Sequence, residues 1–210
     1  MNILILGAGT FGTAIGNELS VNRANSVLLY SSNQDKIHEI NTEHTNKSYF
    51  PNKHLSHTLR ATSSKEDVKK ADVILIALPS STIKDNLIEL KGSFKEGVLI
   101  INLSKGLLSK DIITDMIKEV LGVNNVVTLK GPSFASEIME RADTLLTLGY
   151  MEEYQFELVN KIIKDTSLHI DYTTDIRGVE LLSVLKNIYA LVVGIVDAKY
   201  NSPNTRFMIL

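Results

Sequence analysis

The stretch NILILGAGTFG, residues 2–12, decides the fold of this chain. Its first five residues are almost all apolar, which favours a buried strand, and the GxGxxG turn that follows leads straight into a helix-patterned segment. In such a unit Gly7 permits the tight turn, Gly9 lets the backbone approach a pyrophosphate, and Gly12 lets the helix pack closely on the strand. The phosphates would bind the free N–H groups and positive end of the helix that begins near Thr10. A glycine-rich turn without a ligand is the alternative.

Beyond this unit, short apolar runs alternate with helix-patterned segments, which is typical of a parallel sheet covered by helices on both faces. We therefore predict an α/β fold with a Rossmann-type, doubly wound, mostly parallel sheet. The predicted strands lie at residues 2–6, 26–30, 72–78, 98–103, 125–129, 144–148 and 168–172, with a weaker candidate at 59–62. The predicted helices lie at residues 12–21, 65–70, 81–90, 111–121, 133–141 and 152–165.

The character of the chain changes after residue 174, because residues 175–199 favour one helix that no strand follows. We predict a dinucleotide-binding domain over residues 1–174 and the beginning of an all-helical domain over residues 175–210. Residues 181–196 are nearly uncharged, but the stretch is shorter than the 18 or more residues expected of a membrane span. We interpret it as a buried helix and expect no membrane span.

The composition excludes several classes of function. Apolar residues make up 44% and charged residues 22% of the chain, close to the average of soluble globular proteins. The net charge of −2 argues against a nucleic-acid partner, since phosphate binding requires clustered positive charge. The chain has no cysteine and its five histidines show no metal-ligand spacing, so we expect no metal. We also expect a cytoplasmic protein, because the first apolar run lacks the flanks of a secretory signal.

The end of the second predicted strand indicates which dinucleotide binds. An NAD site usually has Asp or Glu there to bind the ribose 2′-hydroxyl, whereas this chain reads YSSN over residues 30–33. Without a carboxylate there is no repulsion against a 2′-phosphate, which the hydroxyls of Ser31 and Ser32 could bind. We predict a site for NADP or NAD that binds NADPH at least as tightly as NADH. Asp35 is interpreted as a helix cap or a solvated charge.

Two further turns follow predicted strands at the edge where open α/β sheets bind ligands. Lys105 places a cation there that could hold an anionic substrate, although an ordinary surface charge explains such a lysine more often. Gly131 and Ser133 follow the strand at 125–129, with Ser133 as the natural N-cap of a helix. The preference of glycine and serine for turns would explain these two residues equally well.

Lys186 is the only formal charge between Glu180 and Asp197, in a segment that is apolar on nearly all sides. Burial favours the neutral amine and would lower the lysine pKa from its reference of about 10.4. Lys186 is therefore a candidate proton donor and acceptor. A lysine that snorkels to solvent or pairs with a carboxylate is the alternative.

Blocks of sequence follow one another in a characteristic order: GAGTFGTA (7–14), NKSYFP (46–51), ALPS (77–80), SKG (104–106), GPSFASE (131–137), GVE (178–180) and LKN (185–187). Together they resemble bacterial NAD(P)-dependent glycerol-3-phosphate dehydrogenase over all 210 positions. The first block is common to many dehydrogenases. The GPSFASE block and the spacing of GVE from LKN are specific to this family.

The resemblance implies reversible hydride transfer between NAD(P)H and dihydroxyacetone phosphate, forming sn-glycerol 3-phosphate for phospholipid synthesis. Lys186 matches the family's catalytic lysine, whose ammonium would stabilise the charge that grows on the carbonyl oxygen and deliver the proton. The positions that match substrate-contacting residues are Lys105, Gly131 and Ser133. The positions that match cofactor-contacting residues are Thr10, Phe11, Ser32, Tyr49, Lys105 and Ala135.

The family chain continues into a helical domain that supplies an aspartate and an Arg-Asn pair for the substrate, whereas this chain ends on FMIL at 207–210. We therefore expect a fragment with little turnover. The alternatives are an NAD(P)-binding module that does not turn over, and a related reductase for another keto or 2-hydroxy acid. Because apolar side chains surround residues 181–196, we expect a homo-oligomer that buries this helix between copies.

Overall fold

The strand–turn–helix unit predicted at the N-terminus is β1 (Asn2–Leu6), which leads into α1 (Thr10–Leu19). Gly16 lets α1 lie close to the sheet, because a Cβ atom there would come within 2.8 Å of the Leu29 side chain. The computed structural model describes residues 1–106, 111–200, 204–205 and 208. Of the apolar run at 207–210, all but Met208 lies outside the described residues.

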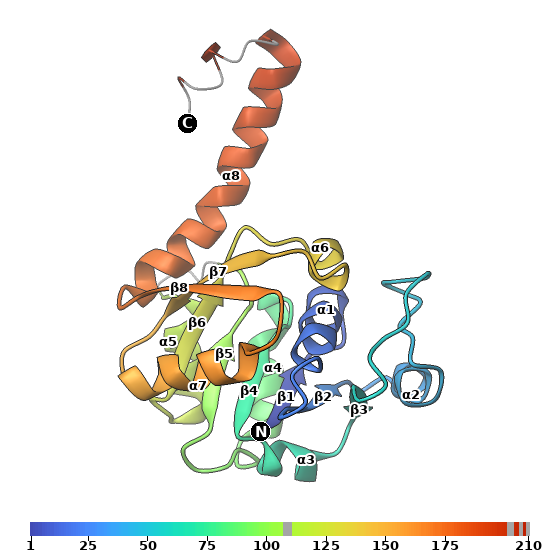
Figure 1. Ribbon diagram of the computed structural model, residues 1–210. Helices are drawn as coiled ribbons and strands as arrows, with labels where there is room; N and C mark the ends of the chain where they lie inside the picture. Colours follow the sequence, from blue (N-terminus) through green and yellow to red (C-terminus); the bar gives the residue numbers. More distant parts are fainter. Residues whose placement is uncertain (107–110, 201–203, 206–207, 209–210) are drawn as a thin grey trace.

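One mostly parallel sheet forms the centre of the molecule (Figure 1). Its strands after β1 are β2 (Ser26–Tyr30), β3 (Arg60–Thr62), β4 (Val73–Ile76), β5 (Leu99–Asn102), β6 (Val126–Lys130), β7 (Thr144–Gly149) and β8 (Leu168–Thr173). The order across the sheet is β3-β2-β1-β4-β5-β6-β7-β8, and only β6 and β7 pair antiparallel. The predicted doubly wound sheet is confirmed, including the weak strand, with ends that differ by one or two residues.

The topology itself marks where a ligand can bind. From β1 the chain builds outward through β2 and β3, and then returns to place β4 on the other side of β1. The loops that follow β1 and β4 therefore leave the sheet in opposite directions. Open α/β sheets bind ligands in the crevice at such a switch point, beyond the carboxyl ends of the strands.

Helices cover both faces of the sheet and divide the core in two (Figure 1). On one face lie α1, α6 (Ala135–Met139) and α7 (Glu153–Ile163), whose apolar residues share one cluster with Ile3 and Ile5 of β1. On the other face lie α3 (Lys65–Lys70), α4 (Ser80–Leu90) and α5 (Ile113–Leu121), whose apolar residues share a second cluster with Leu4 and Leu6. Successive residues of β1 thus enter opposite clusters, as the alternation of side chains along a strand requires.

Two local features differ from the predictions. No helix is predicted near residue 35, but α2 (Gln34–His38) forms there and a π-helical turn (Glu39–Glu43) continues it. The side chain of Asn33 caps α2 by accepting from the Lys36 N–H at 2.9 Å, so Asp35 is a solvated charge and not the cap. The prediction that Ser133 caps α6 is wrong, because the backbone stays extended through Phe134 and the helix begins one residue later.

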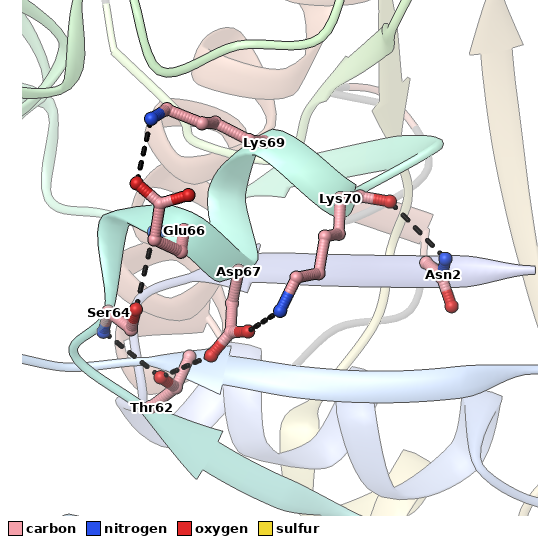
Figure 2. A network of polar contacts seen from close by, with 7 residues as sticks. All are labelled: Asn2, Thr62, Ser64, Glu66, Asp67, Lys69 and Lys70. Carbon is pink, nitrogen blue, oxygen red and sulfur yellow. Dashed lines mark hydrogen bonds and ion pairs between the residues drawn. The ribbon is translucent and has the colours of Figure 1, made fainter.

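Polar contacts fix α3 between two strands, as Figure 2 shows. Ser64 caps the helix by accepting from the Glu66 N–H at 3.2 Å, and Thr62 at the end of β3 donates to Asp67 at 2.7 Å. At the other end of α3, Asn2 of β1 donates to the carbonyl of Lys70 at 3.3 Å. Short helices are marginal alone, so these caps and the burial of Val68 stabilise α3.

The last helix, α8 (Ile176–Tyr200), begins on the sheet and then extends away from it (Figure 1). The prediction that residues 181–196 form a buried helix is wrong for this chain, since Leu182 and Leu191 are each 66% exposed. The reason is that α8 contacts β6 and β7 near its start, and its later turns extend away from the sheet (Figure 1). By length and composition alone, α8 could cross a membrane. The predicted domain boundary near residue 174 falls between β8 and α8.

Candidate active site

The glycine turn after β1 has the geometry that a bound pyrophosphate needs. A Cβ atom on Gly7 would lie 2.6 Å from the Ala77 carbonyl oxygen, and one on Gly12 would lie 2.0 Å from the Gly7 carbonyl oxygen. A Cβ atom on Gly9, in contrast, would meet no atom within 4 Å, so this residue faces open space. Gly9 caps α1 without a side-chain hydrogen bond, and the first turn of α1 holds no acidic residue. The turn therefore fits an anionic ligand at the start of α1.

Two clefts meet at this turn and together form the candidate cofactor groove. One, of about 320 Å³, passes the end of β2 and is lined by Ser31, Ser32 and Lys36. The other, of about 500 Å³, passes the ends of β4 and β5 and holds most of the other predicted ligand contacts. The residues that line both are Gly9, Tyr49, Ala77, Leu78 and Pro79. The predicted contacts that line only the second are Thr10, Phe11, Lys105 and Ser133.

Tyr49 joins the two clefts and holds a cation beside the first. The ammonium nitrogen of Lys36 lies 4.6 Å from the centre of the Tyr49 ring and 3.5 Å from its hydroxyl oxygen. Lys36 therefore faces the region of Ser31 and Ser32 from α2. Sequence reasoning missed Lys36, because the five-residue helix that carries it was not predicted.

A third cavity, of about 170 Å³, brings Gly131 next to Lys186. The ammonium nitrogen of Lys186 lies 5.7 Å from the centre of the Phe134 ring, one residue after Ser133. The prediction that Lys186 is buried is wrong, because the side chain is half-buried where α8 leaves the sheet. Burial first, and the positive charge of Lys186 second, lower the pKa of Lys105. The four predicted substrate and catalytic residues thus belong to one region.

Two of the predicted contacts do not line these clefts. Gly12 lies inside the turn, where it allows close packing, and Ala135 begins α6 partly buried against the core. Among the residues that the structure describes, no group of three or more histidines or carboxylates could hold a metal ion.

A buried polar network behind the clefts escaped the sequence analysis. The carboxylate of Glu180, which is 2% exposed, accepts from the side-chain amide of Asn102 at 2.7 Å and from the Ile113 N–H at 2.9 Å. It also accepts from the hydroxyl of Thr114. Burial lowers the pKa of Lys130 to about 7, while the nearby Glu180 charge opposes this effect. The one sequence signal was Glu180 itself, within the GVE block.

Comparisons with known proteins agree with this geometry. The family described as NAD-dependent glycerol-3-phosphate dehydrogenase N-terminus matches residues 2–156. The family described as NAD-dependent glycerol-3-phosphate dehydrogenase C-terminus matches residues 175–210. The second match begins where α8 begins, so the helix that carries Lys186 belongs to the segment that the C-terminal family covers.

Individual relatives and solved structures cover almost the whole chain. A glycerol-3-phosphate dehydrogenase (NAD(P)+) of Orientia tsutsugamushi is 33% identical over 100% of this chain and 64% of its own length. That of Bacillus subtilis is 32% identical over 99% of this chain and 62% of its own length. The crystal structure of glycerol-3-phosphate dehydrogenase from Coxiella burnetii superposes with a TM-score of 0.85 at 27% identity, covering 99% of this chain and 64% of that one. This chain spans between 62% and 65% of the length of such curated relatives.

Proposed function

The chain belongs to the NAD-dependent glycerol-3-phosphate dehydrogenase family, and we propose that it takes part in the reversible reduction of dihydroxyacetone phosphate to sn-glycerol 3-phosphate. The product would feed phospholipid synthesis in the cytoplasm. One observation carries this proposal: a groove that fits a dinucleotide contains Lys105, whose pKa is lowered by burial and by the nearby positive charge of Lys186. A site for an anionic carbonyl substrate needs such cations.

Different residues along the groove would bind the cofactor and the substrate. The glycine turn and the start of α1 would hold the pyrophosphate, and Tyr49 and Phe11 would flank the rest of the cofactor. When bound, the nicotinamide supplies or accepts the hydride. Lys105 and Ser133 would bind and orient the phosphorylated substrate next to the cofactor. Orientation alone can contribute several kcal/mol to the lowering of a barrier, roughly 7–11 for well-aligned groups.

Lys186 would donate the proton in reduction and accept it in oxidation. As the carbonyl carbon is reduced, negative charge grows on its oxygen, and the ammonium of Lys186 stabilises that charge and donates the proton. In the reverse direction the neutral amine of Lys186 takes the proton back from the alcohol. The half-buried position of Lys186 suits this role, because its side chain lines the cavity that Gly131 also lines.

The reaction is tested by following NADPH oxidation by absorbance with dihydroxyacetone phosphate. Because this chain spans less than two thirds of its relatives, the assay compares the 210-residue chain with an extended chain, which carries in addition the C-terminal segment of a relative. The extended chain should reduce dihydroxyacetone phosphate, and keto acids should not serve as substrates in its place. If the 210-residue chain and the extended chain both bind NADPH but neither reduces a substrate, the alternative of a binding module is favoured.

We expect NADPH to bind the 210-residue chain at least as tightly as NADH. Ser31 and Ser32 offer hydroxyls and no carboxylate to a 2′-phosphate, and Lys36, which lines the same cleft, offers a cation. Ser32→Asp should shift the binding preference toward NADH. Lys36→Gln should weaken the binding of NADPH and leave the affinity for NADH unchanged. Calorimetric titration of the unsubstituted chain and both variants with each cofactor measures all six affinities.

The matched control for the cofactor prediction is Lys47→Gln, which removes an exposed lysine that pairs with Glu43 outside the groove. This variant should change neither affinity. A tenfold preference of the unsubstituted chain for NADH, about 1.4 kcal/mol, would show that the prediction is wrong.

Self-association is the expected partner interaction of the 210-residue chain. Several large apolar side chains of α8 are exposed, which exceeds what monomers usually leave in water. They are Leu181, Leu182, Leu185, Ile188, Tyr189, Leu191, Val192 and Ile195. We expect light scattering at micromolar concentration to find a dimer or larger species. A monomer that binds no apolar dye would contradict this expectation.

We propose that α8 does not span a membrane. Its first turns carry Glu180 and Ser183, which are both buried against the sheet domain, and the half-buried Lys186 follows. A span would place these polar groups in or next to the hydrocarbon, where each is costly.

A further inference from the structure

Lys130 is a buried cation that the proposed mechanism does not use. It ends β6 with only 5% of its surface exposed, although lysine is almost never buried without partners. Its ammonium donates to the carbonyl oxygen of Asn102 at 3.0 Å and to that of Ser104. Both carbonyls belong to the end of β5 and the turn after it, which leads directly to Lys105. The ammonium thus ties β6 to the turn that carries a predicted substrate contact.

The same turn is held at two other polar atoms. The hydroxyl of Ser104 donates to the carbonyl oxygen of Leu78 at 2.6 Å, and the Ser104 N–H donates to the side-chain oxygen of Asn102 at 2.9 Å. The side-chain amide of Asn102 in turn donates to Glu180 on α8. Ser104 is therefore fixed from β4, β5 and β6, and only the contact from β6 carries a positive charge. Charge-assisted hydrogen bonds are roughly twice as strong as neutral ones.

Each of the predicted site residues Lys105, Gly131 and Lys186 is linked along the chain to a residue of this network. Lys105 directly follows Ser104, Gly131 directly follows Lys130, and Lys186 lies on the same helix as Glu180. Lys130 itself lines the same small cavity as Gly131 and Lys186. A shift of the Lys130 ammonium would therefore move the turn before Lys105 relative to α8.

The charges around Lys130 make this contact sensitive to its protonation. Burial lowers the pKa of Lys130 to about 7, with Glu180 on α8 opposing the shift and Lys105 on the β5 turn adding to it. Lys186, on α8, faces the same cavity.

We propose that Lys130 is a positioning residue, which fixes the turn that carries Lys105 and so sets the distance of that ammonium from Lys186 on α8. Lys130 does not contact the substrate. The consequence for turnover rests on the proposed function, whereas the placement of Lys105 can be tested without it.

The first test measures the lysines of the 210-residue chain directly. Trace acylation with acetic anhydride at graded pH, read by mass spectrometry, gives the pKa and reactivity of each amine. In Lys130→Met, the pKa of Lys105 should rise toward its ordinary value, because burial is the first cause of its lowering and the released turn becomes more exposed. An unchanged Lys105 titration in a folded Lys130→Met chain would overturn the proposal.

The matched control is Thr128→Val, a buried residue of the same strand whose hydroxyl makes only a 3.4 Å contact with the Asn102 carbonyl oxygen. The Lys105 titration should be unchanged in this variant. If Lys130→Met does not fold by circular dichroism, Lys130→Gln replaces it, since it keeps an N–H donor without the charge. The pKa of Lys105 should rise there as well, and its failure to rise would equally count against the proposal.

The second test separates positioning from a structural role, using the extended chain. Lys130→Met should lower kcat/KM for dihydroxyacetone phosphate by about tenfold or more, since small displacements of positioning groups are costly. NADPH affinity, set mainly at the β2 end of the groove, should change far less. If kcat/KM and NADPH affinity fell by the same factor, Lys130 would only support the fold. An unsubstituted extended chain without activity would contradict the proposed function, and the Lys105 titration would still decide the positioning role.

Discussion

Lys186→Met in the extended chain should lower kcat for dihydroxyacetone phosphate reduction by about 100- to 10,000-fold. Methionine keeps an unbranched apolar side chain of similar length, but it removes the charge that lies 5.7 Å from the centre of the Phe134 ring and the proton that it carries. The carbonyl oxygen would then develop its negative charge without the cation that should stabilise it. Stopped-flow and steady-state measurements of NADPH oxidation give the effect, and calorimetry should show NADPH affinity close to that of the unsubstituted chain.

A lysine on the same helix provides the control for Lys186. Lys199→Met changes an exposed lysine in the last turn of α8, near the Tyr200 ring, and should leave turnover unchanged. The pKa of Lys105 should also rise in Lys186→Met, because the charge of Lys186 is one of the two causes that lower it. Turnover of Lys186→Met within a few-fold of the unsubstituted chain would show that another group donates the proton.

The sequence predicts those parts of the site that depend on local pattern. The strand before Gly7 and the helix after Gly12 follow from apolar periodicity and glycine spacing over a dozen residues. Lys105 and Ser133 could be placed at the ligand-binding edge because each follows a recognisable strand. Lys186 stood out because a lone charge interrupts an apolar helix; the burial inferred from this was wrong, and its catalytic role stays a prediction.

The features that the sequence did not predict correctly depend on contacts between distant segments or on single side chains. A lysine at the end of a strand is ordinarily solvated, and the burial of Lys130 comes from two carbonyl groups 26 and 28 residues earlier in the chain. The short helix α2 forms because of one capping side chain, Asn33, which the pattern of residues 34–38 does not reveal. The length of apolar sequence at 181–196 predicts a helix, but what covers it depends on the surrounding structure.

Glu180→Gln should destabilise the 210-residue chain by about 3–5 kcal/mol, since three donors converge on its carboxylate and Lys130 depends on its charge. A glutamine side chain has one acceptor oxygen, so its amide group would face either the donors of Asn102 and Thr114, which share one carboxylate oxygen, or the Ile113 N–H at the other. For a chain of this size the expected fall in Tm is roughly 10 °C. Denaturant and thermal unfolding, each followed by circular dichroism, measure the loss.

An exposed carboxylate separates this effect from the removal of charge in general. Glu66→Gln breaks an ion pair with Lys69 on α3 (Figure 2), and such surface pairs contribute about 0–1 kcal/mol. The double variant Glu180→Gln with Lys130→Met should recover part of the loss, because it no longer leaves a buried cation without its counter-charge. If Glu180→Gln costs no more than Glu66→Gln, the network does not hold α8 on the sheet. Lys186 would then owe its place beside Gly131 to the apolar contacts of the first turns of α8.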